Sequence, residues 1–162
     1  MGWLTRRNVT RDWQELTTPL VLDLDALTLT GAECGDPADG LSFLGPGEPG
    51  VLSTEFHFPA KGVTLDVQGG DLRGIHVHTR PNDDELHRGI RPFAGVIRHR
   101  GATLDPAAVD EAAAVARFGP PDAIDDVTDD RYCRRVLTYL PDGTEWELLF
   151  GPDGRLEMVS LY

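Results

Sequence analysis

VLTYLPDGTEWELLFGPDGRLEMVSLY, residues 136–162, has the pattern of three antiparallel strands joined by two tight turns. The turns at 141–143 and 151–154 both contain Pro, Asp and Gly. Proline fixes φ, aspartate bonds back to its own backbone, and glycine accepts a positive φ. Between the turns, apolar and acidic residues alternate with the period of a half-buried strand: Trp146, Leu148 and Phe150 against Glu145 and Glu147.

The last strand of this meander changes phase. Leu156 and Met158 fall on one face, whereas Val159 and Leu161 follow one residue out of step. A β-bulge explains the change, and so does burial on both faces near the terminus. The sequence leaves both explanations open.

A weaker copy of the stretch is TEFHFPAKGVTLDVQGGDLRGIHVH, residues 54–78. The segments before the two meanders also correspond, because each contains strand residues, a helical segment and a Gly-Pro stop, at Leu44-Gly45-Pro46 and at Phe118-Gly119-Pro120. We therefore expect an α+β fold with two tandem copies of a strand–helix–three-stranded antiparallel meander unit. In such a fold the helices pack on one face of the antiparallel sheet.

The chain then divides into a lead segment (1–18), a first repeat (19–80), a linker (81–91) and a second repeat (92–162). The lead segment contains Trp3 and Trp13. It is either a short anchor for a partner or a membrane surface, or a tail tucked against the domain, and the tucked arrangement is favoured because amphipathic membrane helices usually have a longer apolar face.

Within the repeats, residues 19–30 form one strand, or one that turns at Asp25-Ala26 into a second. Asp36-Pro37 and Asp105-Pro106 are helix-start signals. They predict a short helix ending at Leu44 and a clear, alanine-rich helix over 107–118. Residues 45–50 read as a loop rich in proline and glycine.

The order helix, Leu/Phe-Gly-Pro, then meander, given twice, resembles the tandem α+β architecture of the β-lactamase inhibitor protein and related small bacterial lipoprotein domains. The resemblance rests on residues 44–46, 118–121 and the two meanders, and covers most of the chain from Pro19 onward. It implies a concave sheet that holds another protein, and it carries over no functional residues. The chain departs from the secreted members because it has no signal peptide and no cysteine pair within either repeat.

The amino-acid composition argues against several classes of partner and location. The 162 residues carry a formal charge of −12, which argues against nucleic acid or an anionic membrane as partner and suits a basic one. Two cysteines, Cys34 and Cys133, form no metal or redox motif, and one disulfide between them stays open. No stretch is long and apolar enough for a signal peptide or a membrane span, so we expect a cytoplasmic protein without membrane insertion. The oligomeric state stays open.

Histidines are the first candidates for chemistry. His76 and His78 alternate with Val77 on a strand and point to one face, and His87 follows beside three acids. Such a group can chelate a metal, but a zinc site needs three or four ligands in fixed geometry. A polar, solvated face is the favoured interpretation, and we expect no cofactor.

An acidic loop over 122–130 is the second candidate, and its charges suit the capture of a cationic protein. It lacks the glycine and terminal glutamate of a calcium-binding EF-hand, and the matching loop of the first repeat has a single acid. We predict partner-binding residues here, namely Asp122, Asp125, Asp126, Asp129 and Asp130.

No serine lies in a nucleophile elbow and no phosphate-binding loop is present, which disfavours an enzyme without excluding one. The leading hypothesis is a protein-binding module, in one version an immunity or antitoxin-type inhibitor that uses acidic surface against a basic partner. One alternative is a metal-binding protein or metal-dependent enzyme centred on the histidines. Another is a structural accessory subunit that docks through its N-terminal segment.

Overall fold

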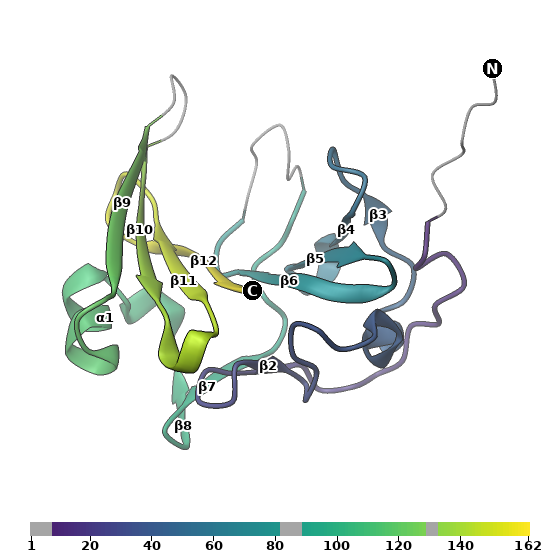
Figure 1. Cartoon of the computed structure of the whole chain (residues 1–162), viewed down its shortest axis with the longest axis horizontal. Helices are drawn as coiled ribbons and strands as arrows, with labels where there is room; N and C mark the ends of the chain where they lie inside the picture. Colours follow the sequence, from purple (N-terminus) through teal and green to yellow (C-terminus); the bar gives the residue numbers. More distant parts are fainter. Residues whose placement is uncertain (1–7, 82–88, 129–132) are drawn as a thin grey trace.

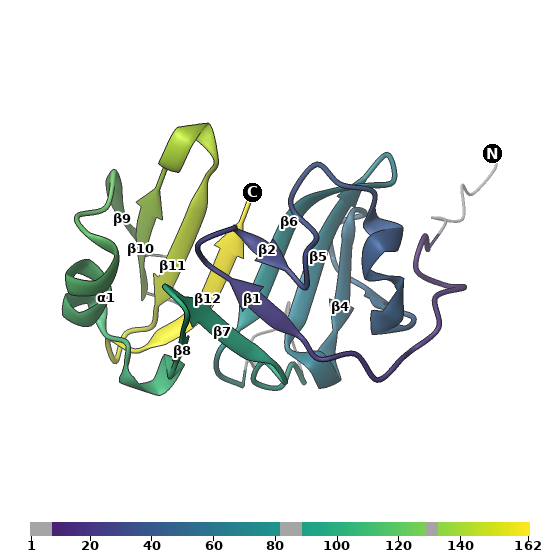
Figure 2. The ribbon, with the colours of Figure 1, turned by 90° about the horizontal axis from the view of Figure 1, so that it is seen from below.

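The computed structural model describes residues 8–81, 89–128 and 133–162 and contains mainly β-strands, arranged in two sheets. The larger sheet is antiparallel and has the order β3-β4-β5-β6-β12-β11-β10-β9. The smaller sheet has the order β2-β1-β7-β8 and lies beneath the larger one in Figure 1 and in front of its centre in Figure 2. The larger sheet comprises Glu48–Pro49 (β3), Glu55–Phe58 (β4), Val63–Gln68 (β5), Asp71–His78 (β6), Ala123–Thr128 (β9), Cys133–Tyr139 (β10), Trp146–Phe150 (β11) and Leu156–Leu161 (β12). The smaller sheet comprises Val21–Asp23 (β1), Thr28–Leu29 (β2), Val96–His99 (β7) and Ala102–Leu104 (β8).

The C-terminal meander is confirmed as β10, β11 and β12. Its first turn places Asp142 at φ 51° and Gly143 at φ 82°, which is the left-handed backbone that these two residue types accept. A register shift opposite Leu149 and Phe150 passes over Glu157, so the phase change in the last strand is a bulge. Because of the bulge, Leu156, Val159 and Leu161 are buried whereas Met158 is only half-buried.

The meander in the first half is likewise confirmed as β4, β5 and β6. Each half also adds a fourth strand that the sequence did not predict. β3 lies within the expected Pro/Gly loop, and β9 occupies most of the expected acidic loop. The prediction of a loop over 122–130 is therefore wrong for residues 123–128, because these pair antiparallel with β10 and the Arg135 guanidinium bridges to Asp126 across the pair at 3.1 Å.

The smaller sheet joins segments that are far apart in the sequence. Residues 19–30 turn at Asp25 and form β1 and β2, as the second of the two expected arrangements has it. β1 then pairs in parallel with β7, Val21 opposite Val96, and β7 forms a hairpin with β8. In the larger sheet β6 pairs with β12. Both sheets therefore continue across the boundary between the predicted repeats.

The helical segments are shorter than expected. Residues 107–118 do not form one helix: a 3₁₀ turn at Pro106–Ala108 (η3) precedes an α-helix at Glu111–Phe118 (α1). The break has two causes: the Asp110 side chain accepts from the amide of Ala113 as an N-cap, and the carbonyl of Val109 accepts from Leu156. The expected helix ending at Leu44 is a 3₁₀ helix, Ala38–Leu44 (η1).

The buried core lies between the two sheets and under the helical segments, and it draws on both halves of the chain. Residues 8–18 of the lead segment contact the first half: Trp13 stacks on Phe58 at 6.0 Å, and Glu15 pairs with Lys61 at 2.7 Å. Trp3, and most of the predicted linker over 81–91, lie outside the described residues. None of the described helices is long and apolar enough to cross a bilayer.

Candidate functional site

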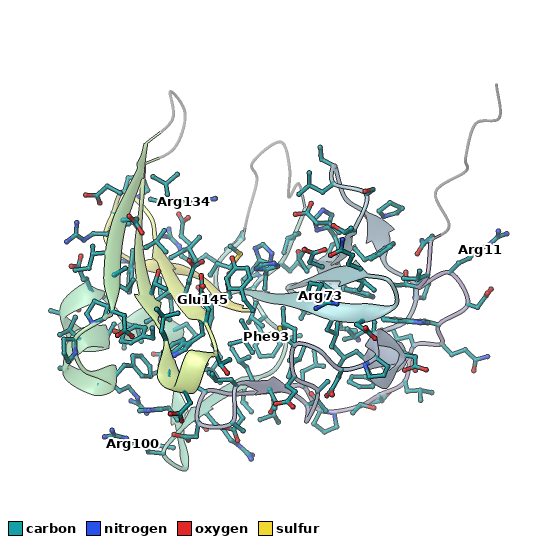
Figure 3. The ribbon with its side chains drawn as sticks, in the orientation of Figure 1. Arg11, Arg73, Phe93, Arg100, Arg134 and Glu145 are labelled. Atoms are coloured by element: carbon teal, nitrogen blue, oxygen red, sulfur yellow. The ribbon has the colours of Figure 1, made fainter. Side chains whose placement is uncertain are left out.

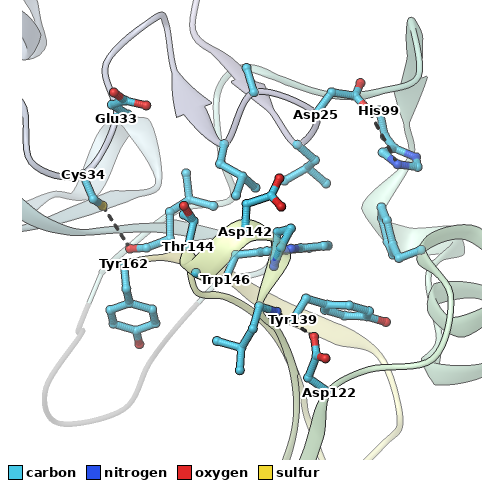
Figure 4. Close-up of a pocket in the computed structure, with 18 of the residues that line it drawn as sticks. Asp25, Glu33, Cys34, His99, Asp122, Tyr139, Asp142, Thr144, Trp146 and Tyr162 are labelled. Carbon is cyan, nitrogen blue, oxygen red and sulfur yellow. Dashed lines mark hydrogen bonds and ion pairs between the residues drawn. The ribbon is translucent and has the colours of Figure 1, made fainter.

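A cleft of about 880 Å³ opens between the smaller sheet and the second half of the larger one. Figure 4 shows the turn between β10 and β11 on one side, with the β1–β2 turn and the Glu33–Cys34 segment opposite it. Among the residues that the structure describes, four carboxylates line the cleft and no lysine or arginine does. These acids are Asp25, Glu33, Asp122 and Asp142.

Backbone hydrogen bonds place two of these acids. Asp23 accepts from the amides of Asp25 and Ala26 at 2.9 and 3.0 Å, an Asx turn that sets the tip between β1 and β2. Asp25 in turn accepts from the amide of Arg100 at 2.6 Å, and Asp122 accepts from the amide of Leu140 at 2.7 Å. These bonds thus hold Asp25 and Asp122 in the lining of the cleft.

Asp142 and Glu33 are both exposed. Asp142 stands at the tip of the β10–β11 turn, where its left-handed backbone is one that aspartate tolerates. Like charges in a partly enclosed space focus the potential, so the cleft attracts cations more strongly than a flat surface with the same acids would.

His99 does not offset this charge. Arg117 Nε, which can only donate, lies 3.2 Å from His99 Nδ1, so the imidazole proton sits on Nε2, which faces Asp25 at 3.7 Å. Burial lowers the pKa of His99, and the nearby Arg117 lowers it further, against the opposing effect of Asp25. The ring is therefore neutral at pH 7 and the cleft keeps its negative charge.

Aromatic side chains form the rigid inner wall of the cleft. Tyr139 and Trp146 stack with ring centroids 4.7 Å apart, and the edge of Phe118 meets Trp146 at 5.1 Å. The Tyr139 hydroxyl donates to the carbonyl of Gly119 at 3.3 Å, and burial raises the pKa of Tyr139. An apolar aromatic wall next to carboxylates suits a side chain with an aliphatic stem and a cationic head.

Cys34 lines the far end of the cleft as a free thiol whose Sγ donates to the carbonyl of Leu161 at 3.4 Å. Burial raises the pKa of Cys34 from 9.0 to about 11. The thiol is therefore protonated near neutral pH, which makes it a poor nucleophile.

The pKa of Cys34 predicts a loss of stability in alkali. Because the unfolded thiol ionises first, the folded state binds more protons above pH 9, so this stability is complete below pH 9 and is lost as pH rises through 11. We expect the free energy of unfolding by urea to fall more steeply across this range in the natural protein than in Cys34→Ala. Parallel curves for the two proteins would contradict the prediction.

Of the three predicted acids that the structure describes, Asp122 lines the cleft and the other two do not. Asp125 and Asp126 lie on β9 and point to opposite faces of the sheet. Asp126 pairs with Arg135, which also contacts Glu111 of α1 at 2.6 Å. Asp129 and Asp130 lie outside the described residues.

Asp125 instead belongs to an acidic group on the face of the larger sheet that points away from the core. Glu147 accepts there from Tyr162 Oη at 3.2 Å and from Thr138 Oγ1 at 3.4 Å. Burial raises the pKa of Glu147, and the carboxylates of Glu145 and Asp125 raise it further. Figure 3 labels Glu145 on this half of the molecule. The second half of the sheet is therefore negative on this face as well as in the cleft.

Two of the predicted histidines, His76 and His78, share one face of β6, as the strand period requires. His76 Nδ1 lies 2.9 Å from Ser160 Oγ, and His78 Nε2 lies 3.0 Å from Thr64 Oγ1. His87 lies outside the described residues. Within residues 8–81, 89–128 and 133–162, no group of three or more His, Cys, Asp or Glu side chains is arranged to hold a metal ion.

The sequence did not single out Asp25, Glu33 or Asp142. They come from separate segments, and only the fold brings them together. The one local signal was the pair of turns that present Asp25 and Asp142.

Comparison with protein-family models, with curated proteins and with solved structures finds no match to this chain.

Proposed function

We propose that this protein is a binding module for a basic protein partner, and that the acidic cleft receives a cationic part of that partner. The observation that carries the proposal is the lining of the cleft, where the described residues include four carboxylates and a wall of aromatic rings but no lysine or arginine. An immunity or antitoxin-type inhibitor in the cytoplasm is one role that fits such a surface, because acidic complementarity speeds the capture of a cationic partner.

The experiment compares two variants that lose the same charge. Glu33→Gln/Asp142→Asn neutralises two cleft acids, and asparagine keeps the left-handed backbone at 142. Asp39→Asn/Glu48→Gln neutralises two exposed acids outside the cleft. The probe is a fluorescent arginine-rich peptide, whose affinity is measured by anisotropy at low and at physiological salt.

We expect the cleft variant to bind the peptide about tenfold more weakly, a change of about 1.4 kcal/mol, and the control variant to bind almost as the natural protein does. Equal losses in the two variants would show that net charge alone attracts the peptide, and would overturn the proposal.

We also infer that the two halves arose by duplication of one unit. The strand order of the larger sheet supports this, because each half contributes four consecutive strands and its last strand lies at the centre. The two Gly-Pro stops support it too: Gly45 and Gly119 have φ of 83° and 90° and ψ of −171° and −177°, a conformation essentially confined to glycine.

The alternatives carry less support. The metal-binding alternative stays a prediction, since His87 and its acidic neighbours are outside the described residues. The accessory-subunit alternative, in which the N-terminal segment docks on another protein, has less support. The described part of the lead segment packs on the first half of the same chain.

A further inference from the structure

The two edges of the larger sheet differ in how they end. At one edge β3 has only two residues, and Pro49 has no N–H to offer. The adjoining backbone of Gly47 is already bonded, since its amide donates to Thr10 Oγ1 at 2.9 Å and its carbonyl accepts from Asn8 Nδ2 at 3.1 Å. The lead segment therefore closes this edge against further strands.

The opposite edge is open. β9 has six residues without proline, and its register with β10 runs without a shift from Ala123 to Thr128. Within the described part of the chain, no strand pairs with its outer side. Figure 1 shows α1 beside its lower part only, and residues 123–127 are exposed, with 47% of Ile124 and 53% of Val127 accessible.

Natural proteins usually protect such an edge with a bulge, a proline, charged side chains or a covering loop. β9 has no bulge or proline, and of its two charges Asp126 is paired with Arg135, which leaves Asp125 as the charge that an incoming strand meets. An edge six residues long with exposed Ile and Val is a surface on which a partner's extended segment can add a strand. The contrast with the protected β3 edge makes the exposure of β9 a specific feature of this half.

The acidic residues of β9 indicate what kind of strand can bind at this edge. A second copy pairing antiparallel through β9 would bring Asp125 and Asp126 against the same acids of its partner, and like charges across a strand pair are destabilising. A basic segment meets Asp125, with Glu145 and Glu147 further across the same face. Asp126 is already paired with Arg135.

We propose that an extended basic segment of the partner binds as an additional strand on the outer edge of β9. This rests on the proposed function and adds to it how the partner binds. Because side chains alternate along a strand, the segment places basic residues on the face of Asp125 and apolar residues beside Ile124 on the other.

The test uses a peptide of about eight alternating arginine and valine residues, a typical strand length. Two further peptides have the same sequence and charge, but one is N-methylated on its arginine amides and the other on its valine amides. Each modification removes the donors of only one edge of the peptide. Strand addition uses a single edge, so we expect one methylated peptide to bind about tenfold more weakly and the other to bind almost as the parent does.

A matched pair of protein variants tests the same edge. Val127→Lys places a cation on β9, whereas Val51→Lys makes the same change at a valine that is 61% exposed near β3. We expect Val127→Lys to weaken binding of the parent peptide about tenfold and Val51→Lys to leave it nearly unchanged.

Three outcomes would overturn strand addition. If both methylated peptides bind as the parent does, charge alone holds the segment, and the proposed function survives. If the parent peptide itself does not bind, the proposed function fails as well. If sedimentation shows a dimer that Val127→Lys dissociates, the occupant of β9 is a second copy of this chain.

Discussion

Leu148→Ala is expected to destabilise the protein by about 2–5 kcal/mol, the range for large-to-small changes in well-packed cores. Leu148 is fully buried at the middle of β11, opposite Leu137 on β10 and Val159 on β12, which are fully buried as well. Removing its side chain leaves a cavity bordered by strands that cannot close on it without breaking their pairing. Because domains of this size are stable by about 5–15 kcal/mol, a large part of the stability would be lost, as urea unfolding would show.

The matched control is Leu149→Ala, one residue along the same strand. Leu149 pairs with Val136 and Met158 on the opposite face and is only half-buried. The same change there removes less buried surface, and we expect a cost of about 1 kcal/mol. Equal costs at 148 and 149 would mean that the two faces of β11 are not divided into core and surface as described.

The sequence was informative wherever a structure is set by neighbouring residues. The Pro-Asp-Gly turn at 141–143 and the alternation through Trp146 and Phe150 both act within a few residues, and the strands they predict are present. The helix over 107–118 shows the limit of such signals. Alanine favours helix throughout the segment, but the hydrogen bond from Leu156 to the carbonyl of Val109 comes from far along the chain and interrupts it.

The prediction of a loop where β9 lies was wrong for a related reason. Residues 122–130 look like a solvated loop because acids are poor strand formers. Pairing with β10 overrides that preference, and Arg135 compensates one of the charges. The cleft was harder still to predict. Asp25 and Asp142 are separated by most of the chain and come to line the same cleft only in the folded protein.

The pairing of β1 with β7 in the smaller sheet involves a close contact at Gly95. The amide of Val96 donates to the carbonyl of Leu20 at 3.0 Å, and this bond begins the parallel register of β1 and β7. A Cβ added at Gly95 would overlap that carbonyl oxygen and lie 2.6 Å from the Cβ of Leu20. The obstacle is partly backbone, which cannot rotate away as the end of a side chain can.

We therefore expect Gly95→Ala to cost about 3 kcal/mol, the upper part of the usual range for overpacking. Gly40→Ala is the control, because nothing lies within 4 Å of a Cβ at that position and its φ is not positive. Thermal unfolding of the two variants measures the difference. Since β1 leads to Asp25 and β7 carries His99, a shifted register also displaces one wall of the cleft, and Gly95→Ala should bind the arginine-rich peptide more weakly than Gly40→Ala does. If the two variants are equally stable, the close approach at Gly95 is not needed to join the halves.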